Sequence, residues 1–97
     1  MSPEARADLD GIWDYIAERA DMGTAEEFIW KFYEIFSSIA SSPRAGVSIP
    51  DFAPGDVRKF PMGNYLICYR SVRSKILIAR VLRGKRLQRR AFLSKQQ

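Results

Sequence analysis

The spacing of apolar residues changes once along this chain, and the change limits the folds that it can adopt. Up to Ser41, apolar residues recur at intervals of three and four, which is the period of an amphipathic helix. From Val57 to Leu82 they gather instead in short runs that are typical of strands. A helical first part followed by a strand-rich second part predicts an α+β fold.

The first helical segment has a recognisable start. Ser2 can cap a helix, and Pro3 at the first helical position gives up no N–H that the helix needs. The apolar stripe that follows runs to a predicted end near residues 21–23 and consists of Ala5, Leu9, Ile12, Trp13, Ile16 and Ala20. The acidic residues that fall largely off this stripe are interpreted as a solvated face: Asp8, Asp10, Asp14 and Glu18.

The second helical segment is predicted to run from Thr24 to about Ser41. Thr24 and Glu27 have the spacing of a capping box, and the short link before them predicts an antiparallel hairpin of two helices. Its main apolar seam is formed by Phe28, Phe32, Ile35, Phe36 and Ile39. Ile29, Trp30 and Tyr33 widen this face, which favours burial on two sides, one against the sheet and the other against a partner. Trp30 itself is predicted to belong to the core.

Three strands are predicted after a loop that Pro and Gly residues mark between positions 43 and 55. They are Val57–Pro61, Tyr65–Arg70 and Lys75–Leu82, and Leu87–Leu93 is predicted to form a short terminal helix before a polar tail. We therefore expect one domain over residues 1–97, in which an N-terminal antiparallel helical hairpin packs on a small three-stranded antiparallel sheet.

The composition excludes several kinds of chemistry. The chain has no histidine and one cysteine, so it cannot form an internal disulfide, a Cys/His zinc site or a histidine-dependent catalytic couple. Cys68 lies in a strand-like run and is predicted to be a buried structural thiol. We predict no catalytic residue, no metal and no cofactor. No apolar run approaches the roughly 18–20 residues of a membrane span and no signal peptide opens the sequence, so we expect a cytoplasmic protein with no membrane partner.

The net charge of +5 conceals a division between the two parts of the chain. Residues 1–56 carry four basic and eleven acidic side chains, a net charge of −7, whereas residues 57–97 carry twelve basic side chains and no acidic one, a net charge of +12. This asymmetry indicates binding to nucleic acid, binding to an acidic protein, or attraction between the two parts of the fold. Attraction within the fold does not account for all of it, because five positive charges remain unbalanced.

Several motifs, in this order along the chain, resemble the RelE/ParE toxin superfamily and its ParE-type branch. They are Ser2–Leu9 and Ile12–Ile16 in the first helix, Phe60-Pro61-x-Gly63-x-Tyr65, and Tyr69-Arg70, and the resemblance covers nearly the whole chain. The resemblance implies the toxin of a type II toxin–antitoxin pair. Such a toxin stalls DNA gyrase, and a ParD-like antitoxin neutralises it by folding its C-terminal segment onto the toxin. Members usually begin with a short strand before the first helix, and here only Met1 and Ser2 precede Pro3. Either this sequence starts short or the sheet has three strands. In the second case an unpaired edge invites another strand, from the antitoxin or from a second copy of the toxin.

The alternative within the superfamily is a RelE-type toxin, which cuts messenger RNA on the ribosome. Such cleavage must deprotonate a ribose hydroxyl and stabilise a phosphorane-like charge. The position where that branch carries an arginine on the second strand is Leu66, and the terminal aromatic is Phe92, which has no hydroxyl. Lys59 and Arg86 do remain in roughly corresponding places. The sequence therefore favours a toxin that works by binding, without catalysis.

The predicted target- or antitoxin-binding residues all lie in the basic part of the chain: Arg83, Lys85, Arg86, Arg89, Arg90, Arg58, Arg70 and Arg80. For Arg70 and Arg80, ion pairs with acidic residues of the helical hairpin are an equally weighted alternative. The segment Arg83–Arg90 holds five basic residues in eight and is predicted to meet gyrase or an acidic tail of the antitoxin. A non-catalytic nucleic-acid-binding module is a third possibility that charge supports. The aromatic residues lie at core spacings, so we expect no sequence-specific nucleic-acid binding.

Overall fold

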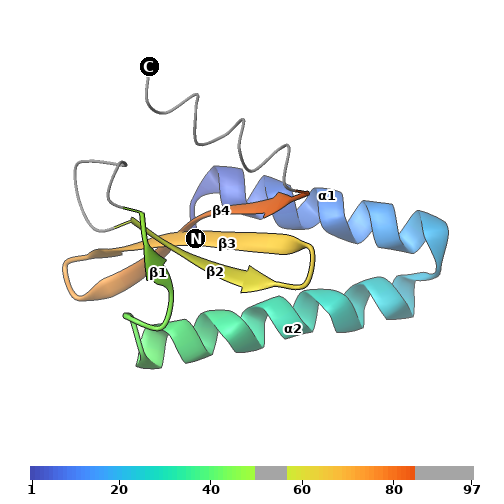
Figure 1. The fold of residues 1–97 in the computed structure, drawn as a ribbon. Coiled ribbons are helices and arrows are strands. Elements are labelled where there is room, and N and C mark those ends of the chain that lie inside the picture. The colour runs from blue at the N-terminus through green and yellow to red at the C-terminus, as the bar shows by residue number, and fades with distance from the viewer. Residues whose placement is uncertain (50–56, 85–97) are drawn as a thin grey trace, which may run out of the picture.

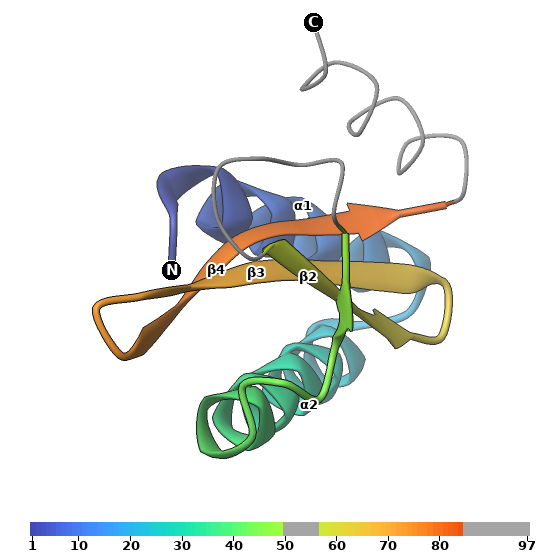
Figure 2. The same ribbon diagram turned by 60° about the vertical axis from the view of Figure 1, so that its left-hand side comes forward.

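Two helices and a four-stranded antiparallel sheet form the computed structural model, which describes residues 1–49 and 57–84 (Figure 1). The elements in chain order are α1 (Pro3–Arg19), α2 (Met22–Ser41), β1 (Val47–Ser48), β2 (Val57–Met62), β3 (Tyr65–Val72) and β4 (Lys75–Arg83). The strands lie side by side in that order, and α1 packs against both α2 and β4 (Figure 2). The α+β class and the helical hairpin that the sequence predicts are confirmed.

The start of α1 is tied to the sheet. The Ser2 hydroxyl accepts a hydrogen bond from the Ala5 N–H at 3.0 Å, which confirms the predicted cap, and it donates to the Ala79 carbonyl at 2.7 Å. The Ser2 backbone N–H also donates to the Ile78 carbonyl at 2.9 Å. Along this stretch, the outer edge of β4 is therefore not left unpaired as we expected, because the residues before the helix bond to it.

The start of α2 differs from the prediction. Asp21, and not Thr24, is the N-cap, and its carboxylate accepts a hydrogen bond from the Thr24 N–H at 2.7 Å. That backbone hydrogen bond is the main reason why the pKa of Asp21 lies below its ordinary value. Because α1 ends at Arg19, two residues before the predicted end, Asp21 is available as a cap and the helix begins two residues before Thr24.

A short edge strand lies where the sequence predicts a loop. In β1, Val47 pairs with Lys59 and Ser48 with Arg58 of β2, so the sheet has four strands and not three. Both residues of β1 are exposed. A strand of two exposed residues has no alternation of apolar and polar side chains, and this is why the pattern did not reveal it. The other three strands match their predicted positions and each extends one or two residues further.

The core lies between the helices and one face of the sheet. Phe32 of α2 is fully buried, and its ring lies 5.4 Å from that of Tyr65 in an edge-to-face arrangement. The other buried members of this cluster are Ala5, Leu9, Ile12, Ile39, Ile67, Tyr69, Ile78 and Val81. Leu66, Cys68 and Leu82 form a small second cluster, and by strand alternation they lie on the other face of the sheet. Cys68 is thus a buried thiol within an apolar cluster, as predicted.

The outer face of α2 leaves aromatic surface in solvent. Trp30 is 62% exposed and Tyr33 is 41% exposed, and their ring centres lie 6.0 Å apart. The prediction that Trp30 belongs to the core is therefore wrong. The inner face of the helix is filled by the seam residues Phe32 and Ile39, so the wide apolar pattern of α2 is buried on one side only.

Candidate protein-binding surface

The predicted binding residues fall into two groups. Arg58, Arg70, Arg80 and Arg83 lie on β2, β3 and β4, where the strands fix their positions. The other four, Lys85, Arg86, Arg89 and Arg90, lie outside the described residues, as do the terminal helix predicted over Leu87–Leu93 and the position of Phe92.

Arg80 is paired with Asp8 of α1, and the two side chains are 35% and 16% exposed. Its Nε donates to Asp8 Oδ2 at 2.8 Å and its Nη2 donates to Oδ1 at 3.1 Å, which is a bidentate ion pair. Asp8 Oδ2 also accepts the Val81 N–H at 2.8 Å. The hydrogen bonds to this carboxylate raise the pKa of Arg80. The predicted internal ion pair is confirmed for Arg80, and the assignment of Asp8 to a solvated face is wrong.

Arg58 supports the loop after α2. Its Nη1 donates to the Gly46 carbonyl at 2.8 Å and to the Arg44 carbonyl at 3.3 Å. The same loop is bound by Tyr69, whose hydroxyl donates to the Pro43 carbonyl and accepts the Gly46 N–H, both at 2.8 Å. In the part of the chain that is described, Arg58 therefore has a structural role that explains its position.

Arg70 is exposed near the tip of the β3–β4 hairpin. Within residues 1–49 and 57–84, no acidic side chain pairs with it, so the alternative of an internal ion pair does not hold there. Arg70 lines a shallow pocket of 440 Å³ with Arg73, Lys75 and apolar residues of both strands. The turn at this tip is unusual, because its central residues Arg73 and Ser74 have φ values of 50° and 66° without being glycine.

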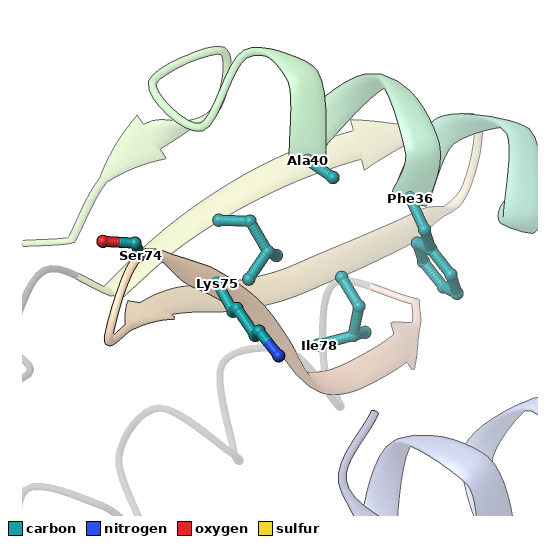
Figure 3. A pocket seen from close by; sticks show the side chains of 6 residues that line it. Phe36, Ala40, Ser74, Lys75 and Ile78 are labelled. Carbon is teal, nitrogen blue, oxygen red and sulfur yellow. The ribbon is translucent and has the colours of Figure 1, made fainter.

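A second shallow pocket lies beside the same hairpin, between the C-terminal part of α2 and the start of β4 (Figure 3). Its volume is 310 Å³, and Phe36, Ala40, Ile76 and Ile78 give it apolar walls. Ser74 and Lys75 supply its polar side. The β3–β4 hairpin thus borders two open pockets, one against α2 and one lined by basic side chains.

Arg83, at the end of β4, contacts α1 through a residue that the sequence did not single out. Its Nη2 donates to the Tyr15 hydroxyl at 2.8 Å, and its guanidinium carbon lies 3.9 Å from the centre of the Tyr15 ring. The guanidinium carbon of Arg19 lies 4.1 Å from the same centre. Tyr15 and Arg19 are four residues apart on a helix, which places them on one face. The sequence alone could not show that Arg83 lies beside Tyr15 and Arg19, because it is far from them along the chain.

Over residues 1–49 and 57–84, no group of three or more His, Cys, Asp or Glu side chains could hold a metal ion. The helices found over the same residues are too short or too polar to cross a bilayer.

The fold and its basic strands match known proteins. A family model described as the ParE toxin of type II toxin–antitoxin system, parDE, matches residues 1–88. The chain belongs to the ParE toxin family. Toxin ParE1 of Mycobacterium tuberculosis, strains CDC 1551 / Oshkosh and ATCC 25618 / H37Rv, is 31% identical over 70 residues, which cover 72% of this chain and 70% of that protein. These matches confirm the resemblance to the ParE-type branch.

A solved structure extends the ParE likeness to the fold. The structure of the "Chromosomal ParDE TA system from P. aeruginosa" superposes with a TM-score of 0.73, covering 87% of this chain and 91% of that chain. At 23% identity, this likeness concerns the fold alone. It agrees with the helical hairpin and the antiparallel sheet described above.

In this ParE-family chain, the position of Leu66 is part of a packed cluster. Leu66 is 8% exposed and groups with Cys68 and Leu82. Lys59 lies opposite Cys68 in the register of β2 and β3. Arg80 lies opposite Cys68 on β4, and Asp8 neutralises its charge.

Proposed function

We propose that this ParE-family toxin acts in the cytoplasm by binding DNA gyrase, makes or breaks no bond with its own side chains, and is neutralised by a ParD-like antitoxin. The family match supports a toxin of a toxin–antitoxin system. The similar solved structure is that of a ParDE system, which supports an antitoxin as the partner. Among partners, we expect no membrane and no nucleic acid bound by sequence.

The observation that carries the choice of mechanism is the apolar cluster at Leu66. A RelE-type nuclease needs cationic and proton-transferring groups over the strands. Here Leu66, Cys68 and Leu82 fill that position with apolar side chains, and the neighbouring Arg80 is committed to Asp8. The chain also has no histidine. Among the described residues considered for RNA cleavage, Lys59 is the one cation that remains, and one cation does not supply both an acid and a base.

The proposal is tested by induced expression in bacteria, with and without a co-expressed ParD-like antitoxin. We expect filamentous growth and a DNA-damage response without the antitoxin, and normal growth with it. Purified toxin should inhibit supercoiling by gyrase and accumulate cleaved DNA. A rapid stop of translation with cut messenger RNA would contradict gyrase binding and indicate RelE-type cleavage. Unaffected growth together with unaffected gyrase activity would contradict both mechanisms.

The basic segment after β4 is tested in the same assays. We propose that Arg86, Arg89 and Arg90 contact gyrase or the antitoxin, and that reversing all three to Glu abolishes toxicity, antitoxin affinity, or both. The matched control reverses Arg6, Lys31 and Arg44, which removes as many positive charges from exposed positions in the acidic part of the chain. Equal effects of the two triple reversals would assign the loss to net charge and not to this segment.

A further inference from the structure

Two arginines from distant parts of the chain meet at one tyrosine. Arg19 lies in the last turn of α1 and Arg83 ends β4, and both are exposed. Their guanidinium carbons lie 4.1 and 3.9 Å from the centre of the Tyr15 ring. Both distances start from the same point, so the two cations are separated by about 8 Å at most, which does not exceed the screening length of about 8 Å at physiological ionic strength.

This arrangement gathers like charges without an acidic partner. Among the described residues, neither guanidinium forms an ion pair, although α1 carries several carboxylates nearby in sequence. The Tyr15 ring attracts both cations, and its hydroxyl accepts a hydrogen bond from Arg83. Each guanidinium carbon lies over the ring, and among the described residues no carboxylate accepts a hydrogen bond from the remaining N–H groups. An anion placed against those groups would relieve the repulsion of the two charges.

The electrostatics of Tyr15 are consistent with a local positive potential. Its pKa lies below the ordinary value, first because of the hydrogen bond from Arg83 and then because of Arg19. The surface around the cluster has the opposite sign. Helix α1 carries five acidic side chains against two basic ones, a net charge of −3, and Asp14 and Glu18 flank the cluster directly in sequence.

We propose that Tyr15, Arg19 and Arg83 form a receptor for one carboxylate side chain of an acidic protein segment. The planar fork of arginine matches a carboxylate, which enters as a single charge. A nucleic-acid backbone carries a charge at every phosphate, and the phosphates beside the receptor would face the negative surface of α1. In the sequence, Arg83 is followed by Lys85 and Arg86, so the positive charge continues along the chain.

The receptor deepens the proposed function, because an acidic antitoxin segment is the partner that it would engage. The receptor rests on the proposed function only in naming the antitoxin as the protein that binds it. Its test therefore uses a synthetic peptide whose glutamates are separated by stretches of neutral residues, together with the purified full chain, and it requires neither toxicity nor a cognate antitoxin. Binding is followed by calorimetry and by the NMR signals of the Tyr15 ring and the arginine side chains.

Three substitutions locate the binding. Arg19→Gln and Arg83→Gln should each weaken peptide binding by about fivefold or more, since each removes charge-assisted hydrogen bonds. Arg6→Gln is the matched control, because it removes one exposed positive charge from the same helix at the other end, and it should weaken binding by less than about twofold. The peptide should also raise the pKa of Tyr15 by neutralising the two arginines. An ultraviolet titration of the four tyrosines should show this change in the wild type, and the change should be absent in Tyr15→Phe.

The proposal is overturned if Arg6→Gln weakens binding as much as the other two substitutions, because the attraction would then be due to net charge alone. It is also overturned if the Tyr15 signals do not respond to the peptide, or if duplex DNA binds more tightly with the same dependence on Arg19 and Arg83. Circular dichroism confirms that each variant is folded. A wild-type chain that is toxic but does not bind the peptide would reject the receptor and leave the proposed function standing. A chain that binds the peptide but is not toxic would reject the proposed function and leave the receptor standing.

Discussion

At the scale of single residues, the Tyr69 hydroxyl connects β3 to the loop that follows α2. The side chain is fully buried, and its hydroxyl donates a hydrogen bond to the Pro43 carbonyl and accepts one from the Gly46 N–H. Tyr69→Phe leaves these two groups without their partner, so we expect the free energy of unfolding to fall by about 1–3 kcal/mol in urea denaturation. Tyr33→Phe is the control, since Tyr33 is 41% exposed, and it should change stability little. Equal stabilities of the two variants would contradict this role of Tyr69.

At the scale of elements, the two hairpins of the sheet differ in turn chemistry. Gly63 supplies a φ of 58° between β2 and β3, whereas Arg73 and Ser74 adopt φ values of 50° and 66° between β3 and β4. Positive φ is unfavourable for side chains other than Gly, Asn and Asp. Arg73→Asn with Ser74→Gly should therefore raise the free energy of unfolding by about 1–2 kcal/mol, measured by urea denaturation. Gly63→Ala should lower it, and a destabilised Asn-Gly variant would show that the native side chains contribute more than the turn costs.

The elements also show what the sequence could predict. Local signals were sufficient for the start of α1 at Ser2 and for β2, β3 and β4, because capping chemistry and apolar spacing act over a few residues. They were insufficient for β1, which has no buried face. For α2, Asp21 and Thr24 are both good N-cap residues. Asp21 is the N-cap in the structure, because α1 ends at Arg19 and leaves Asp21 outside the first helix.

For the candidate site, the sequence identified the basic strand residues but not their partners. Arg83 and Tyr15 are 68 positions apart, and Arg80 and Asp8 are 72 positions apart. No periodicity relates residues at such separations, so their pairing is decided by how α1 docks beside β4. The same docking explains why Asp8 was assigned to a solvated face, since a carboxylate beside an apolar stripe has no local signal for a partly buried ion pair.

At the scale of the whole molecule, the acidic first part and the basic second part are joined by the Asp8–Arg80 ion pair and by the bond from Asp8 to the Val81 N–H. Asp8→Ala removes both of these links but leaves the Arg83–Tyr15 hydrogen bond between β4 and α1, and we expect it to lower the free energy of unfolding by about 2–3 kcal/mol in urea denaturation. Asp8→Asn keeps an oxygen for the Val81 N–H and loses only the charge, so it should cost about half as much. In a double-mutant cycle with Arg80→Met, the coupling should be about 1 kcal/mol or more, because each partner is desolvated when α1 docks. A coupling near zero would mean that this ion pair adds no stability beyond the other contacts between the two parts, which include the bonds from Ser2 and Arg83.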